Sequence, residues 1–111
     1  MKPERDDIPP GTLEMLILKT LARSRELHGF QIADSIQQVS DDVLHVEEGS
    51  LYPALQRMLI KGWIEGEWGK TEENRRARYY RLTPEGRTQL AHELERYRRV
   101  SNAIARIVRP A

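Results

Sequence analysis

The stretch from Val46 to Ile64 constrains the fold of this chain more than any other. Its apolar residues recur at the spacing of a helix that buries one stripe, at Leu51, Leu55, Met58 and Leu59. Its other face is polar near the start, where free backbone N–H groups and the helix dipole favour an anion. Such a helix suits a DNA groove. On this stretch alone, an ordinary surface helix with a polar outer face is the simpler interpretation.

We expect the helix to begin at a cap on Gly49 or Ser50 and to end at Gly62. Pro53 then falls in the first turn, where little or no intrahelical hydrogen bonding is lost. The residues of this helix that could contact DNA lie outside the apolar stripe. They are Ser50, Tyr52, Pro53, Gln56, Arg57 and Lys61.

A β-hairpin is predicted directly after this helix. Ile64, Gly66 and Trp68 alternate with acidic residues, and Tyr80 and Leu82 are expected on the same face of the return strand. The tip, residues 69–76, is basic and longer than a two-residue turn. A hairpin in this place is a wing whose tip can reach a phosphate backbone or a minor groove. The alternative is a solvated turn whose arginines pair with neighbouring glutamates. The candidate contacts are Lys70, Arg75, Arg76 and Arg78.

Charge is distributed unevenly along the chain. Residues 1–60 hold six Lys or Arg against ten Asp or Glu, and residues 61–111 hold twelve against seven, so the two parts carry about −4 and +5. The whole chain carries a formal net charge of only +1. A local basic cluster on a balanced protein indicates one face for a polyanion.

Two helices are predicted before the central one. The first spans Gly11 to about Ser24 and is apolar over most of its circumference, so we infer that a second chain covers part of it. The second spans Phe30 to about Val39, with Phe30 available for burial, and we expect His28 to serve the turn into it. Residues 43–46 form a short connection that could pair as a brief strand. These pieces are the ingredients of a helix-turn-helix.

The last helix begins with a cap at Thr83 and a proline at its first position. Its apolar residues recur at alternating spacings of four and three, a heptad-like seam with Ser101 as a polar interruption. We expect this seam to pack on the first helix of a second protomer, and the alternative is a helix folded back on its own domain. The predicted dimer interface comprises Leu13, Ile17, Leu21, Leu90, Leu94, Tyr97, Ile104 and Val108.

Four segments resemble the PadR family of bacterial transcriptional regulators. They are G-T-L-E-M-L-I-L-K-T-L at residues 11–21, L-H-G-F-Q-I-A at 27–33, E-E-G-S-L-Y-P-A-L-Q-R-M at 47–58 and R-R-A-R-Y-Y-R-L-T-P-E-G-R at 75–87. The chain is similar to the short-form members, which have a single C-terminal dimerisation helix.

The resemblance implies a homodimer that binds an inverted-repeat operator and usually represses. It implies that Ser50, Tyr52 and Pro53 belong to the recognition-helix motif and that Arg75, Arg76 and Arg78 belong to the basic wing. It also implies a possible small hydrophobic or phenolic effector near the dimer interface. There the last helix offers Tyr97 and no tryptophan.

Several other classes of protein are disfavoured. The chain has no cysteine, which excludes disulfides and Cys-based zinc sites, and its three histidines are dispersed, so no metal and no cofactor is expected. No nucleophile elbow or phosphate-binding loop occurs, and we expect no enzyme. No apolar run approaches the ~20 residues of a membrane span. The first ten residues do not resemble a signal peptide, so a cytoplasmic location is the default.

Together these patterns predict a mainly α fold with a small β-hairpin, an α+β winged helix-turn-helix followed by a C-terminal dimerisation helix. The expected division is a flexible arm or extended lead-in over residues 1–10, a DNA-binding domain over 11–82 and the dimerisation helix over 83–111. The predicted function is sequence-specific regulation of transcription by a homodimer on double-stranded DNA. The alternative is a winged-helix module that binds protein without specific DNA binding.

Overall fold

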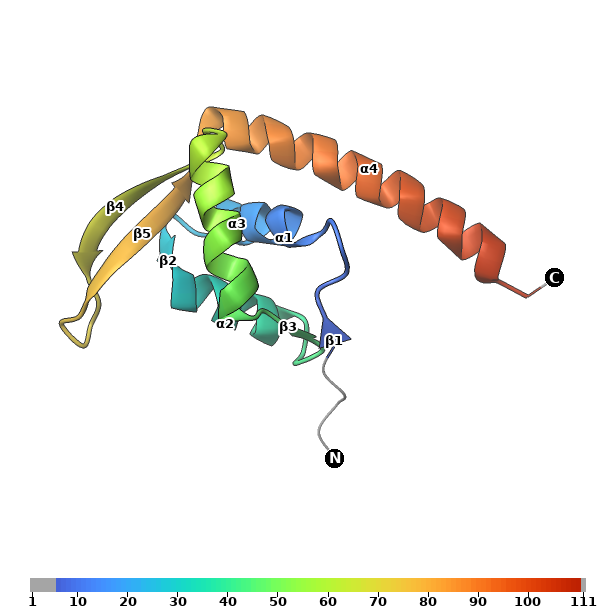
Figure 1. Cartoon of the computed structure of the whole chain (residues 1–111). Helices are drawn as coiled ribbons and strands as arrows, with labels where there is room; N and C mark the ends of the chain where they lie inside the picture. Colours follow the sequence, from blue (N-terminus) through green and yellow to red (C-terminus); the bar gives the residue numbers. More distant parts are fainter. Residues whose placement is uncertain (1–5, 111) are drawn as a thin grey trace.

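The computed structural model describes residues 6–110. Four helices surround one small core, and short strands lie at its edges (Figure 1). The elements in chain order are β1 (Asp6–Asp7), α1 (Leu13–Arg23), β2 (Leu27–His28), α2 (Gly29–Val39), β3 (Leu44–His45), α3 (Glu48–Ile60), β4 (Ile64–Lys70), β5 (Arg76–Leu82) and α4 (Pro84–Val108). The predicted class, an α+β winged helix with a long last helix, is confirmed.

The core is built around α1, which contacts α2, α3, α4 and β5. Met15, Ile17, Leu18 and Leu21 of α1 are at most 6% exposed in a single chain. The other elements of the same chain thus bury most of the apolar surface of α1, and the inference that a second chain covers part of it stays a prediction for residues that are only partly buried, such as Leu13. Apolar periodicity shows how much surface a helix must bury, and here the other helices of the same chain bury most of it.

The α2 helix starts as the sequence predicts. His28 is its cap: the ring Nδ1 accepts a hydrogen bond from the backbone N–H of Gln31, and the Gln31 side chain accepts one from the N–H of His28. Phe30 departs from the prediction of burial because its side chain is 72% exposed. It lies in the first turn of α2.

Residues 6–10 form an ordered, extended lead-in. Asp6 and Asp7 pair in parallel with Leu44 and His45, and Ile8 packs against the core. The predicted brief strand near Val43 is thus present as β3. Of the two predicted alternatives, residues 6–10 agree with the extended lead-in rather than the flexible arm, and residues 1–5 fall outside the described part of the chain.

The wing forms with the predicted register. Ile64 pairs with Leu82, Gly66 with Tyr80 and Trp68 with Arg78, and β2 adds to the other edge of β5 in a sheet of order β2-β5-β4. The loop at the tip is closed by backbone hydrogen bonds from Thr71 to Arg75 and from Asn74 to Thr71. Asn74 adopts a left-handed conformation with φ of 62°, which asparagine tolerates better than most residues.

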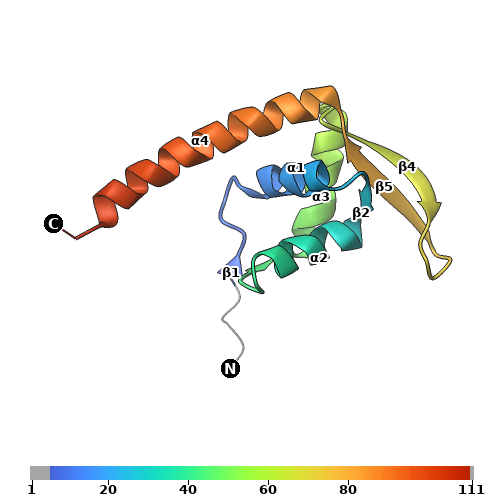
Figure 2. The same cartoon turned by 180° about the vertical axis from the view of Figure 1, so that it is seen from behind.

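The last helix joins the base of the wing and then leaves the core. Thr83 caps it by accepting a hydrogen bond from the N–H of Gly86 at 3.0 Å. A Cβ on Gly86 would lie 2.0 Å from the carbonyl oxygen of Trp63, so only glycine permits this approach. Leu90 and Leu94 pack on the protomer's own core. In Figures 1 and 2 the second half of α4 runs beyond all other labelled elements, on the side away from the wing.

Candidate nucleic-acid interface

The α3 helix presents a polar face at its N-terminal end. Leu51, Ala54, Leu55 and Met58 are at most 1% exposed and hold the helix on the core. Ser50, Tyr52, Pro53 and Gln56 are all exposed. The structure therefore brings four of the predicted contact residues together on one open surface, at the end of the helix that carries its positive dipole.

Two corrections apply to the start of α3. The cap is Glu47, two or three residues before the predicted one, and its side chain makes no capping hydrogen bond. Pro53 is consequently in the second helical turn rather than the first. Its ring nitrogen cannot donate to the carbonyl of Gly49, so one hydrogen bond of the helix is missing. The prediction followed the preference for glycine and serine at caps, whereas Glu47 adopts the extended backbone of a cap, with φ of −75° and ψ of 140°.

Arg57 and Lys61 are placed differently from the other candidates on α3. The Arg57 Nε lies 3.3 Å from Oε1 of Glu14, and the Lys61 Nζ lies 3.9 Å from Oε2 of the same carboxylate. The Lys61 ammonium also lies 4.4 Å from the centre of the Trp63 ring. Both cations are thus held toward α1 and are not grouped with Ser50 and Tyr52.

The N-terminus of α2 adjoins this surface, which the sequence patterns did not indicate. Tyr52 lies over Gly29, where a Cβ would be 2.8 Å from the tyrosine hydroxyl oxygen. His28 packs edge-on against Tyr79 at 5.4 Å between ring centres. The clue in the sequence was the glycine after His28, because glycine at a helix start often marks a close approach.

One face of the wing is basic and aromatic. Arg76 stacks on Trp68 with its guanidinium carbon 4.3 Å from the ring centre, and Arg78 crosses Gly66 toward Tyr80. The Nε of Arg78 is buried, and its N–H donates no hydrogen bond to any of the described residues. Burial raises the pKa of the Tyr80 phenol above its usual value, so this hydroxyl stays protonated at neutral pH.

The two surfaces face each other across an open groove of about 1120 Å³. Helices α2 and α3 contribute Phe30 and Tyr52 to it, and the wing contributes Trp68, Lys70, Arg75 and Arg76. No ion pair joins Arg75 or Arg76 to Glu72 or Glu73 in the described residues. The guanidinium groups are therefore free to bind anions in the groove.

The predicted dimer residues divide into two groups. Ile17 and Leu21 are 0% and 1% exposed within the protomer, so their placement at an interface is wrong. Leu90 is also buried on its own core, and Leu13 and Leu94 are partly buried there. Tyr97, Ile104 and Val108 are 50% to 73% exposed, and Val100 and Ile107, which the heptad pattern missed, lie with them on one side of α4.

Comparison with known proteins decides the family. The model of the transcriptional regulator PadR-like family matches residues 17–92, which include α2, α3, the wing and the start of α4. The chain belongs to the PadR-like family of transcriptional regulators. Family membership makes it a DNA-binding regulator with a winged helix, and not an enzyme.

Solved structures agree with this PadR-like assignment. A transcriptional regulator from Clostridium thermocellum is 27% identical with a TM-score of 0.81, and the match covers 89% of this chain and 95% of that one. A PadR family regulator from Clostridium difficile R20291 is also 27% identical, with a TM-score of 0.75 over 89% and 100% of the two chains. Among curated proteins, uncharacterized protein X of Lysinibacillus sphaericus is 28% identical over 90% of this chain and 91% of its own length.

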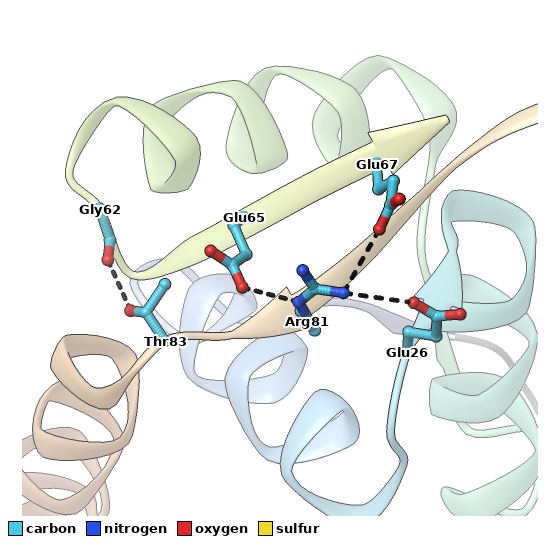
Figure 3. A network of polar contacts seen from close by, with 6 residues as sticks. All are labelled: Glu26, Gly62, Glu65, Glu67, Arg81 and Thr83. Atoms are coloured by element: carbon cyan, nitrogen blue, oxygen red, sulfur yellow. Dashed lines mark hydrogen bonds and ion pairs between the residues drawn. The ribbon is translucent and has the colours of Figure 1, made fainter. Parts of the chain in front are cut away.

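Ion pairs on the opposite face of the wing brace the hairpin of this PadR-like regulator. Arg81 Nε lies 2.6 Å from Glu65, and its Nη1 lies 3.5 Å from Glu67 and 3.8 Å from Glu26 (Figure 3). The hydrogen bond to Glu65 raises the pKa of the Arg81 guanidinium further above its usual value. The threonine before α4, Thr83, donates a hydrogen bond to the Gly62 carbonyl at 2.6 Å and joins the wing to the end of α3.

Two further properties concern the described residues of this PadR-like protein as a whole. None of their helices combines the length and the hydropathy needed to cross a membrane. Across residues 6–110, no group of three or more His, Cys, Asp or Glu side chains could hold a metal ion.

Proposed function

We propose that this regulator binds an inverted-repeat operator as a homodimer and represses transcription. In this proposal α3 enters the major groove and the wing contacts the backbone or the minor groove. One observation carries it: Tyr52, on the exposed N-terminal half of α3, and the arginine-bearing face of the wing border the same groove. A helix tip in the major groove can read base edges, and nearby arginines can bind phosphates. In the proposed complex α3 would therefore provide sequence specificity, and the wing would provide contacts to the backbone.

The proposed contacts follow from this placement. Ser50, Tyr52, Pro53 and Gln56 belong to the helix that enters the major groove, and Lys70, Arg75, Arg76 and Arg78 belong to the wing. Arg57 and Lys61 stay in the proposal as contacts to phosphate only, because each would have to leave Glu14 to reach further.

Dimerisation is supported by the second half of α4. Tyr97, Val100, Ile104, Ile107 and Val108 form an apolar face that the protomer leaves exposed. A second copy of this chain is the proposed occupant, with α4 of one protomer lying against α1 and α4 of the other, so that Leu13 and Leu94 lie at the edge of the contact. A small hydrophobic or phenolic effector near this interface belongs to the same proposal, with exposed Tyr97 as the side chain that could stack on it.

In vitro selection of duplex DNA by the purified protein tests the proposal. We expect a motif with two inverted half-sites whose centres are about 34 Å apart, or a multiple of that distance. Affinity should fall steeply with salt, with a log–log slope of about −0.9 for each phosphate neutralised. Recovery of no motif, together with no retardation of random duplex at low salt, would refute specific and general DNA binding alike.

The second candidate is an interaction module that uses the same face for a protein. The exposed rings of Phe30 and Trp68 in the groove favour it, because exposed aromatic residues are common at protein interfaces. The double change Arg75→Ala with Arg76→Ala separates the two functions. A DNA-binding regulator loses affinity for every duplex sequence, whereas a protein-binding module keeps its partner.

A further inference from the structure

Glu14 lies where the recognition helix meets the rest of the molecule. It is in the first turn of α1, and its side chain is only 21% exposed. One oxygen pairs with Arg57 and the other with Lys61, which are separated by about one helical turn on α3. A single carboxylate therefore holds the C-terminal end of α3 at two points.

The α4 helix reaches the same place through Glu93. Burial raises the pKa of the Glu93 carboxyl, and the nearby Glu14 charge raises it further. The Gln89 side chain and the positive charges of Lys61 and Arg96 lower it. Among the described residues, no group forms a hydrogen bond with the buried Oε2 of Glu93. Residues from α1, α3 and α4 thus form one polar cluster.

We propose that Glu14 is a positioning residue that sets the angle of α3 relative to α1 and α4, and thereby the spacing of half-sites that the dimer accepts. This inference rests on the proposed function. The buried face of α3 sets where the helix lies on the core, and the two ion pairs limit its rocking about that face.

The geometry gives the size of the effect. Ser50 lies seven residues before Arg57 and eleven before Lys61, which corresponds to about 10 to 16 Å along the helix. A tilt of about 15° at the Glu14 end would move the N-terminal tip by about 3 to 4 Å, close to the 3.4 Å between successive base pairs of a strand. A small loss of restraint is thus enough to change the preferred spacer by one base pair.

The first test uses a series of operators built from the selected motif, with the spacer lengthened or shortened by one and two base pairs. We expect the wild type to bind its best spacer about tenfold or more tightly than the other spacers. For Glu14→Gln, we expect this ratio of affinities to fall to about threefold. Affinity for random duplex should not fall, because the change removes a negative charge and releases Arg57 and Lys61 for phosphate. A spacer profile of Glu14→Gln identical to that of the wild type would overturn the proposal.

Glu95→Gln is the matched control, because it makes the same chemical change on α4 at an exposed carboxylate that forms no ion pair in the described residues. It should keep the wild-type profile, and a profile flattened as much as that of Glu14→Gln would overturn the proposal. If Glu14→Gln does not fold, Glu14→Asp replaces it. Aspartate keeps the negative charge on a side chain that is one methylene shorter. We therefore expect this variant to prefer the best spacer less strongly than the wild type but still to show a preference. A spacer profile identical to that of the wild type would again overturn the proposal.

A second test needs no DNA. The chain has no cysteine, so Glu48→Cys carries one spin label per protomer at the tip of α3. The distances between the two labels of a dimer should broaden when Glu14→Gln is added, and an unchanged distribution would overturn the proposal. If the distribution broadens although the wild type binds no duplex, DNA binding fails while the positioning role of Glu14 stands.

Discussion

Replacement of Ile104 by aspartate is the sharpest test of the proposed dimer. Ile104 lies at the centre of the apolar face of α4 and is 53% exposed in the protomer. It is a better target than Leu94, which also packs on the protomer's own core, so that its replacement would confuse dissociation with unfolding. A change at Ile104 leaves the protomer's core untouched.

The expected effect is large because the interface of a symmetric dimer contains the residue twice. Full burial of an isoleucine contributes about 1.5 to 3 kcal/mol, so covering the exposed half contributes about 1 kcal/mol in each protomer. The two new carboxylates must also lose water without a positive partner, which costs several kcal/mol more. A total above about 4 kcal/mol corresponds to a dissociation constant at least about a thousandfold weaker, at about 1.4 kcal/mol for each factor of ten.

Sedimentation equilibrium measures the dimer, and thermal unfolding checks the protomer. Asn102→Asp is the matched control, because it places a carboxylate on the exposed opposite side of the same helix. We expect Ile104→Asp to sediment as a folded monomer with weak operator binding and Asn102→Asp to remain a dimer. An intact Ile104→Asp dimer would refute the assignment of this face to a second copy.

Three further predictions concern single residues. Arg76→Ala should make the log–log salt slope of binding less steep by about 0.9 and weaken all duplexes alike, as measured by titration at several salt concentrations; a loss confined to the operator would contradict a phosphate contact. Gly29→Ala should displace the exposed ring of Tyr52 and weaken operator binding while the free energy of unfolding changes by less than about 1 kcal/mol, so unchanged affinity would count against a role for Tyr52. Because the pKa of Glu93 is raised in the fold, its favourable contribution is complete below the unfolded-state pKa and is lost as the pH rises through the folded-state value. Glu93→Gln should remove that loss. In chemical denaturation its free energy of unfolding should therefore rise relative to that of the wild type as the pH increases above about 4, and a constant difference would refute the shift.

The wing and the last helix could be predicted closely from the sequence. Alternation between Ile64 and Trp68 fixes which residues share a face, and therefore the register with Tyr80 and Leu82. Thr83 and Pro84 mark the start of α4 because each suits a position that only a helix start offers. In both cases local chemistry determines the structure, and distant residues add little.

The features that sequence patterns missed depend on contacts between distant segments. The pairing of Asp6 and Asp7 with β3 involves two residues on each side, too few for any period to be visible. The apolar surface of α1 indicated burial but not whether the same chain or a second chain provides it, and so Ile17 and Leu21 were assigned to the wrong partner. Phe30 is as apolar as a core residue, yet its side chain is 72% exposed and lines the groove.

The charges on α3 show why a candidate site needs more than a count of basic residues. Arg57 and Lys61 are chemically as suited to phosphate as Arg75 and Arg76. Glu14 pairs with both Arg57 and Lys61, whereas Arg75 and Arg76 form no ion pair within the described residues. A phosphate that recruits Arg57 must first break an existing ion pair, while one that meets Arg76 finds a guanidinium already stacked on Trp68 and oriented. In the proposed complex, the free energy of DNA binding is therefore concentrated at the wing and at the tip of α3, and we infer that the cations near Glu14 set the orientation of that tip.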